Sequence, residues 1–121
     1  QELGRLKHAA AFACLGARLA EFRGNFSIEP RYKGSPQRNG TVLTNNKLES
    51  LNPDVVVHAM RNATNVQCVY ELKFPCYERH RLNPMDAPTV GAQLDSYQYL
   101  AKGCRVTLVT PSGGLEPYKG R

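Results

Sequence analysis

Apolar residues recur at three- and four-residue steps over the first part of the chain, which is the spacing of an amphipathic α-helix. The predicted helix runs from Leu3 to about Arg23 and ends at Gly24-Asn25. Its apolar stripe consists of Leu6, Ala10, Ala13, Ala17 and Ala20. Because alanine side chains are short, we expect this stripe to pack closely on a sheet.

The next segment, Phe26 to Lys33, alternates apolar and polar residues and is predicted to be a β-strand. Pro30 has no backbone N–H, so this strand should lie at a sheet edge or carry a bulge. Residues Gly34 to Asn46 are rich in Gly, Ser, Pro, Asn and Arg, which indicates a loop. Because the stretch before Asp54 is long, a first strand near Gly40 to Thr44 is the alternative.

Two further strands are predicted at Val55 to Met60 and at Val66 to Phe74, with a turn at Arg61 to Asn65 between them. So short a connection predicts an antiparallel hairpin. Successive side chains of a strand point to opposite faces, so Glu71 and Lys73 leave the second of these strands on the same face.

The second half of the chain predicts a helix between two strands. Residues 76–88 are predicted to form a polar loop, and the helix is expected from Thr89 to Lys102, with Gly103 at its C′ position. A last strand is expected from Arg105 to Thr110 and is ended by Pro111-Ser112-Gly113-Gly114. A strand–helix–strand connection predicts a parallel pair, so the sheet should be mixed.

These elements predict a single α/β domain over residues 1–121, with a mixed β-sheet of about four strands flanked by helices. The formal net charge is +6 and the pI is near 9.4, which favours a polyanionic partner such as nucleic acid. No apolar run approaches the roughly 20 residues that span a bilayer, so no membrane partner is expected.

The cysteines are scattered along the chain at Cys14, Cys68, Cys76 and Cys104, without a CxxC pair or zinc-type spacing. Cys14 and Cys68 fall on predicted apolar faces, where a thiol behaves as a small hydrophobe. We therefore expect reduced, buried thiols. A structural disulfide is the alternative.

Asp54 stands just before the second predicted strand, and Glu71 and Lys73 lie on the third. If the hairpin brings these strands together, Asp54 and Glu71 are suitable ligands for Mg²⁺, which one or two carboxylates hold together with waters and substrate oxygens. Lys73 could orient or deprotonate a water, or stabilise developing negative charge. The alternative is that Glu71 and Lys73 form the solvated face of an amphipathic strand.

Three short motifs resemble those of the PD-(D/E)xK nuclease superfamily, whose fold is restriction-endonuclease-like. They are Pro53-Asp54, Glu71-Leu72-Lys73, and a Q-x-x-x-Y motif at Gln93 and Tyr97. The helix-β-β-β-helix-β order matches the core of that fold. The resemblance implies a site with Mg²⁺ or Mn²⁺ held by Asp54, Glu71 and the carbonyl of Leu72. It further implies that Lys73 is catalytic and that Gln93 and Tyr97 lie near the substrate phosphate.

Several other residues are secondary candidates. Glu21 follows Ala17 by four residues in the first helix and is either an additional metal ligand or an ordinary surface acid paired with an arginine. His58 is either a proton shuttle or a satisfied sheet histidine. His80 lies between two arginines and either contacts phosphate or belongs to a solvated loop.

The small size, the basic charge and the absence of a starting methionine suggest an effector module from a longer polypeptide. The chain is similar to the restriction-endonuclease-fold toxin domains at the C-terminus of secreted bacterial proteins. That resemblance implies delivery into the cytoplasm of a target cell and a cognate immunity protein in the producer. An acidic immunity protein would complement the positive charge.

The sequence therefore predicts a metal-dependent endonuclease that acts on DNA in preference to RNA, because the family mostly cuts DNA. Two alternatives stay open. One is a module that binds nucleic acid or protein on a nuclease-like fold without cutting. The other is a metal-independent ribonuclease toxin that uses His58 or His80 with Lys73.

Overall fold

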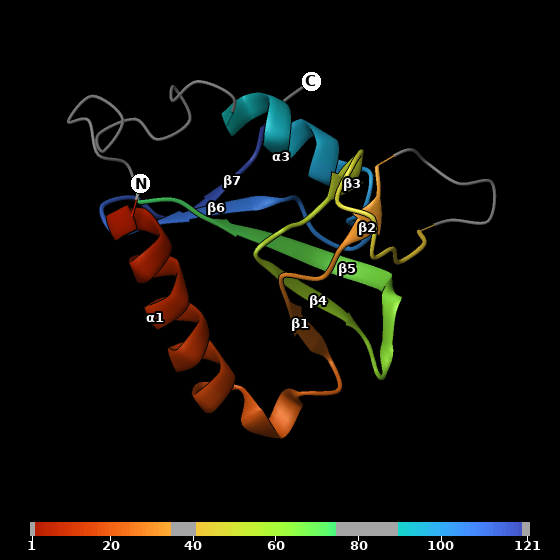
Figure 1. Cartoon of the computed structure of the whole chain (residues 1–121), viewed down its shortest axis with the longest axis horizontal. Helices are drawn as coiled ribbons and strands as arrows, with labels where there is room; N and C mark the ends of the chain where they lie inside the picture. The colour runs from red at the N-terminus through yellow and green to blue at the C-terminus, as the bar shows by residue number, and fades with distance from the viewer. Residues whose placement is uncertain (1, 35–40, 75–89, 120–121) are drawn as a thin grey trace.

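A mixed five-stranded sheet forms the centre of the computed structural model, which describes residues 2–34, 41–74 and 90–119 (Figure 1). The strand order is β1-β4-β5-β6-β7. The strands are β1 (Phe26–Ile28), β4 (Val55–Ala59), β5 (Asn62–Leu72), β6 (Thr107–Thr110) and β7 (Gly114–Pro117). β5 pairs antiparallel with β4 and parallel with β6. The predicted α/β class, hairpin, parallel pair and mixed sheet are thus confirmed.

The segment predicted as a single first strand is divided between two sheets. β1 lies at the edge of the main sheet, as Pro30 predicted. Glu29, with a φ of 52°, and Pro30 then turn the chain away into a second, two-stranded sheet. Its strands are β2 (Tyr32–Lys33) and β3 (Ser50–Leu51). Within the described part of residues 40–44, strand pairing is limited to one bridge between Tyr32 and Leu43.

The turn between β4 and β5 is tighter than the sequence indicated. Arg61 adopts a φ of 53°, and β5 begins at Asn62, inside the predicted turn, instead of at Val66. β5 ends at Leu72, but the N–H of Lys73 still donates to the carbonyl of Val109 at 3.0 Å. The backbone of Lys73 is therefore held by the sheet although it lies beyond the strand.

The helices of the described residues are α1 (Glu2–Arg18), which a single 3₁₀ turn η1 (Ala20–Phe22) follows, and α3 (Val90–Gln98). α3 ends at Gln98 instead of Lys102, so the predicted C′ role of Gly103 is wrong. The N–H of Gly103 donates to the carbonyl of Gln67 on β5 at 2.9 Å. No helix in these ranges is long and apolar enough to cross a bilayer.

β7 was not expected from the sequence. The Pro111–Gly114 segment does end β6, but Gly114 has a φ of 65° and leads into this additional edge strand. Leu115 on β7 is 69% exposed, so β7 has no buried face to produce an alternating pattern.

The predicted sheet-facing stripe of α1 is wrong. Leu6 is 53% exposed, and the alanines of the stripe are exposed as well. The half-buried face consists instead of Gly4, His8, Ala11, Phe12, Leu15, Gly16 and Leu19. This face carries larger apolar side chains than the alanine stripe, so turning it inward removes more apolar area from water.

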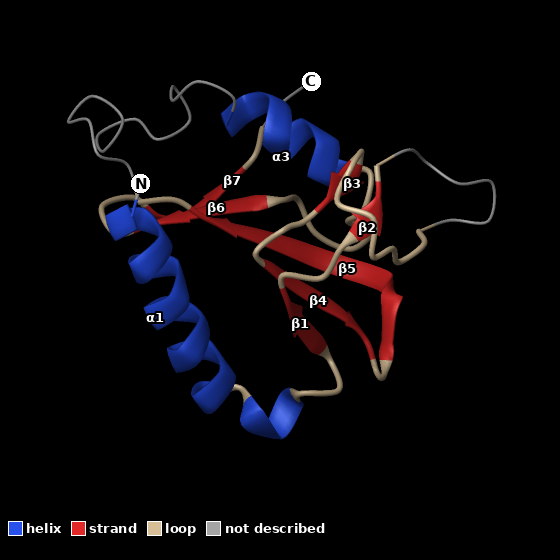
Figure 2. Ribbon diagram, in the orientation of Figure 1, coloured by secondary structure: helices blue, strands red, loops and turns tan. Residues whose placement is uncertain are grey.

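α3 lies over one face of the sheet (Figure 2), and the hydrophobic core lies between the two. α3 and the residues just after it contribute Val90, Leu94, Tyr97 and Leu100, and the sheet contributes Val56, Val66, Val69 and Leu108. α1 has no buried residue. The position of α1 against the sheet therefore depends on a few half-buried contacts, and His8 makes one of them.

The expectation of reduced, buried thiols is wrong for Cys68 and Cys104, and for Cys14 it holds only in that the thiol is free. Cys68 of β5 and Cys104 form a disulfide, and Cys14 is exposed. The parallel pairing of β5 with β6 brings the two bonded residues together, with 4.9 Å between their Cα atoms. Cys76 lies outside the described residues.

Candidate active site

Asp54 and Glu71 lie opposite each other at the ends of β4 and β5. The strand register pairs Val55 with Tyr70, and one further step of that antiparallel register brings Asp54 to Glu71. The two residues are 8% and 3% exposed. Two acidic side chains far apart in sequence thus become a buried pair, as the predicted hairpin required.

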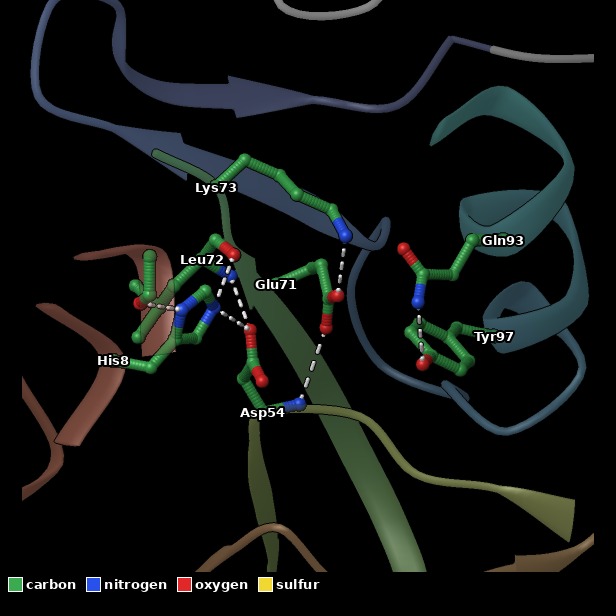
Figure 3. A network of polar contacts seen from close by, with 8 residues as sticks. His8, Asp54, Glu71, Leu72, Lys73, Gln93 and Tyr97 are labelled. Carbon is green, nitrogen blue, oxygen red and sulfur yellow. Dashed lines mark hydrogen bonds and ion pairs between the residues drawn. The ribbon is translucent and has the colours of Figure 1, made fainter. Parts of the chain in front are cut away.

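Backbone hydrogen bonds fix both carboxylates (Figure 3). The N–H of Leu72 donates to Asp54 Oδ2 at 2.7 Å, and the N–H of Asp54 donates to Glu71 Oε1 at 3.2 Å. Hydrogen bonds from backbone N–H groups stabilise the charged form of a carboxylate. Each carboxylate of the buried pair thus has one backbone N–H donor to one of its oxygens.

Lys73 supplies a positive charge beside this pair. Its Nζ lies 3.2 Å from Glu71 Oε2, and its side chain is 29% exposed. Because Lys73 is two residues after Glu71 at the end of the strand, both side chains leave the chain on the same side. The ammonium group can therefore contact both Glu71 and a molecule that binds next to Glu71.

The pKa of Glu71 is raised to about 7. Burial is the largest cause, and the neighbouring Asp54 charge raises the pKa further, whereas Lys73 lowers it. A divalent cation between the two carboxylates would remove the repulsion and favour the charged form of Glu71.

Gln93 and Tyr97 face this group from α3 (Figure 3). The Gln93 Nε2 donates to the hydroxyl oxygen of Tyr97 at 3.2 Å, which joins two side chains one helical turn apart. Burial and the nearby charge of Glu71 raise the pKa of Tyr97, so its hydroxyl stays protonated. Gln93 Oε1 is buried without a hydrogen-bond partner within the described ranges.

His8 of α1 also belongs to this group, although it was not predicted from the sequence. Its Nε2 lies 2.8 Å from the carbonyl oxygen of Leu72 and 3.4 Å from Asp54 Oδ2, and its Nδ1 lies 2.9 Å from the carbonyl oxygen of Gly4. Carbonyl oxygens only accept, so both ring nitrogens must donate. Burial lowers the His8 pKa, but the contacts with Gly4, Asp54 and Leu72 outweigh it, and the pKa is raised.

One signal in the sequence could have found His8. Gly4, His8 and Phe12 repeat at four-residue steps, and Leu15 and Leu19 continue the same face. Both this stripe and the alanine stripe have helical spacing. The larger apolar residues of this stripe indicate that it is the face turned toward the sheet.

The other candidates are placed elsewhere. Glu21 is exposed in η1, beyond the end of α1, whereas His8 lies near its start. The ten residues of α1 after His8 span about 15 Å, so the structure does not bring Glu21 to the acidic pair. His58 bonds to Ser27 Oγ at 2.9 Å and to the carbonyl of Ala59 at 2.8 Å, as a satisfied sheet histidine would. His80 lies outside the described residues.

The available oxygens fit a divalent cation such as Mg²⁺ or Mn²⁺. Within the described residues no group of three or more His, Cys, Asp or Glu side chains forms a metal cluster. Asp54, Glu71 and the Leu72 carbonyl nevertheless offer oxygen donors at one place, and Mg²⁺ needs only one or two carboxylates besides waters and substrate oxygens. Comparison with family models, curated proteins and solved structures finds no match for the chain.

Proposed function

We propose that this protein is a metal-dependent nuclease that hydrolyses phosphodiester bonds, with DNA as the favoured substrate. The observation that carries the proposal is the buried pair of Asp54 and Glu71 with Lys73 3.2 Å from Glu71. Burying two acids next to each other costs stability, because each disfavours the charge of the other. A cation-binding function gives a reason for keeping this arrangement.

The residues have distinct roles in this proposal. Asp54, Glu71 and the carbonyl of Leu72 would hold Mg²⁺ or Mn²⁺, which when bound neutralises phosphate charge and lowers the pKa of water. Lys73 orients the attacking water or stabilises negative charge on the phosphate. Its contact with Glu71 fixes the direction of its flexible side chain before substrate binds.

Gln93 and Tyr97 contribute from the opposite side of the site. The protonated hydroxyl of Tyr97 and the amide N–H groups of Gln93 are donors suited to phosphate oxygens. Gln93 Oε1, which has no partner among the described residues, can accept from Lys73 or from a water once substrate orders them. Both residues lie on α3, which packs into the core through Val90, Leu94 and Tyr97.

The order of elements supports placing the protein in the PD-(D/E)xK superfamily. α1, β1, β4, β5, α3 and β6 follow one another in the helix–three strands–helix–strand order of the restriction-endonuclease-like core. β2 and β3 are insertions between its first two strands, and β7 is an addition at its edge.

We further propose that the domain acts as a toxin or effector in competition between bacteria. In this proposal it is delivered as part of a larger secreted protein, acts in the cytoplasm of the target cell, and is neutralised by an immunity protein in the producer. The disulfide supports passage through an oxidising compartment. The charge of +6 supports both a nucleic-acid substrate and an acidic immunity protein.

The test is cleavage of supercoiled plasmid and, separately, of total RNA, each with Mg²⁺ and with EDTA. Lys73→Ala is the diagnostic variant, and Lys102→Ala, which removes an exposed lysine, is its matched control. We expect DNA cleavage that requires both metal and Lys73 and survives in Lys102→Ala. Cleavage of RNA in EDTA would favour the metal-independent ribonuclease, and folded protein that cuts neither substrate would favour the binding module.

A further inference from the structure

His8 joins the two residues that supply metal-binding oxygens in the proposed site. Its Nε2 contacts the Leu72 carbonyl at 2.8 Å and Asp54 Oδ2 at 3.4 Å. The N–H of Leu72 itself donates to Asp54 Oδ2 at 2.7 Å. The three residues therefore close a ring of polar contacts in which each one touches the other two.

This ring of polar contacts determines which oxygen atoms have no donor and can still bind a cation. Asp54 Oδ2 already faces two donors, the Leu72 N–H and His8, whereas no residue in the described ranges donates to Asp54 Oδ1. The Leu72 carbonyl has two lone pairs, and His8 takes one of them. What remains is one carboxylate oxygen and one carbonyl lone pair.

The imidazole ring is itself held by one further hydrogen bond and by two aromatic rings. The carbonyl of Gly4, one turn earlier in α1, receives its Nδ1–H at 2.9 Å. The rings of Phe12 and Phe74 contact it edge to face, with centroids 5.8 and 5.0 Å away. A side chain fixed by both packing and hydrogen bonds can impose its geometry on the groups that it contacts.

We infer that His8 is a positioning residue of the metal site. It holds Asp54 and the Leu72 carbonyl so that Asp54 Oδ1 and one carbonyl lone pair stay free and would bind a cation together with Glu71. Hydrogen-bonded partners of metal ligands have this effect in general, and their loss typically lowers metal affinity 10- to 100-fold. The role rests on the proposed function and adds to it a residue outside the three short motifs.

The experiment titrates the full chain with Mn²⁺ alone by calorimetry, and it does not depend on cleavage. His8→Leu keeps an apolar side chain between the two phenyl rings and removes the donor. His8→Gln places an amide N–H near the position of Nε2. Leu15→Ala, on the same half-buried face of α1, is the control for weakened helix packing.

We expect His8→Leu to lower Mn²⁺ affinity about 10- to 100-fold and His8→Gln to restore most of it. Leu15→Ala should lower the melting temperature in EDTA and leave the affinity unchanged. Unchanged affinity in His8→Leu would overturn the role of His8, and so would higher affinity, which would make His8 a competitor of the cation. If Leu15→Ala loses as much Mn²⁺ affinity as His8→Leu does, His8 acts only through the packing of α1. If the wild-type protein binds no Mn²⁺, the proposed function fails as well.

Discussion

The backbone N–H of Asp54 donates to Glu71 Oε1 at 3.2 Å, so the residue that carries the first acid of the candidate site also holds the second. The contact is a consequence of the hairpin, because the β4–β5 register sets Asp54 opposite Glu71. Neutralising either side chain should therefore change cation binding without dismantling the strands.

Asp54→Asn should abolish most cation binding while the fold is kept. Asparagine retains an oxygen that can accept the Leu72 N–H, so this backbone donor at the end of β5 keeps its hydrogen bond. It also removes the negative charge beside buried Glu71, and the melting temperature in EDTA should be unchanged or higher. Calorimetry with Mn²⁺ should show a loss of affinity of more than about 100-fold.

Glu21→Gln is the matched control for Asp54→Asn. Glu21 is exposed in η1 and the structure does not bring it to the acidic pair, so its neutralisation should leave Mn²⁺ affinity at the wild-type value. A comparable loss of affinity in Glu21→Gln would instead support its role as a metal ligand.

Stability in EDTA should fall as the pH rises from about 5 to 8. The pKa of Glu71 is raised from 4.5 to about 7, so in this window the native protein keeps a proton that the unfolded chain has lost. The free energy of unfolding then decreases with rising pH. The raised pKa of His8 acts in the same direction, because stability from its charged form is lost as the pH rises through that pKa.

Urea unfolding at several pH values measures this effect. Glu71→Gln should show a shallower decrease than the wild-type protein, with the remaining slope due to His8 and other groups. Saturating Mg²⁺ should also flatten the wild-type curve, since the cation favours the charged form of Glu71. Identical slopes for wild type and Glu71→Gln in EDTA would contradict the raised pKa.

The sequence predicted the acidic pair but missed His8, and the reason is physical. Alternation along a strand and a short turn are local features, so they suffice to set Asp54, Glu71 and Lys73 together. α1 offers two apolar stripes with the same spacing, and only packing against the rest of the fold decides between them. The parallel pair of strands was predicted, but the Cys68–Cys104 bond also depends on the register of that pair, which no local pattern contains.

Gln93→Leu should separate stability from activity. The variant removes a buried oxygen that has no partner in the described structure, although it also removes the contact with Tyr97. The free energy of unfolding should be unchanged or higher by up to about 1 kcal/mol. DNA cleavage should fall at least about 10-fold, because the amide no longer faces the substrate phosphate.

Gln98→Leu, on the same helix, is the control. Gln98 Oε1 accepts the N–H of Val106 at 3.2 Å, so this substitution leaves a backbone donor without its partner. It should destabilise the protein by about 1 to 2 kcal/mol and leave cleavage unaffected. If both leucine variants destabilise equally, Gln93 serves the fold and not the site.

The disulfide should contribute stability without contributing to the site. Cys68 and Cys104 are 36 residues apart, and closing a loop of that length in the unfolded chain stabilises the native state by about 4 kcal/mol. Cys68 and Glu71 lie on opposite faces of β5, so the double variant Cys68→Ala/Cys104→Ala should keep wild-type Mn²⁺ affinity. Urea unfolding with and without dithiothreitol measures how much the disulfide stabilises the native state. The free energy of unfolding of the reduced wild type should match that of the double variant. A wild-type unfolding curve that does not respond to reductant would show that the bond does not form in solution.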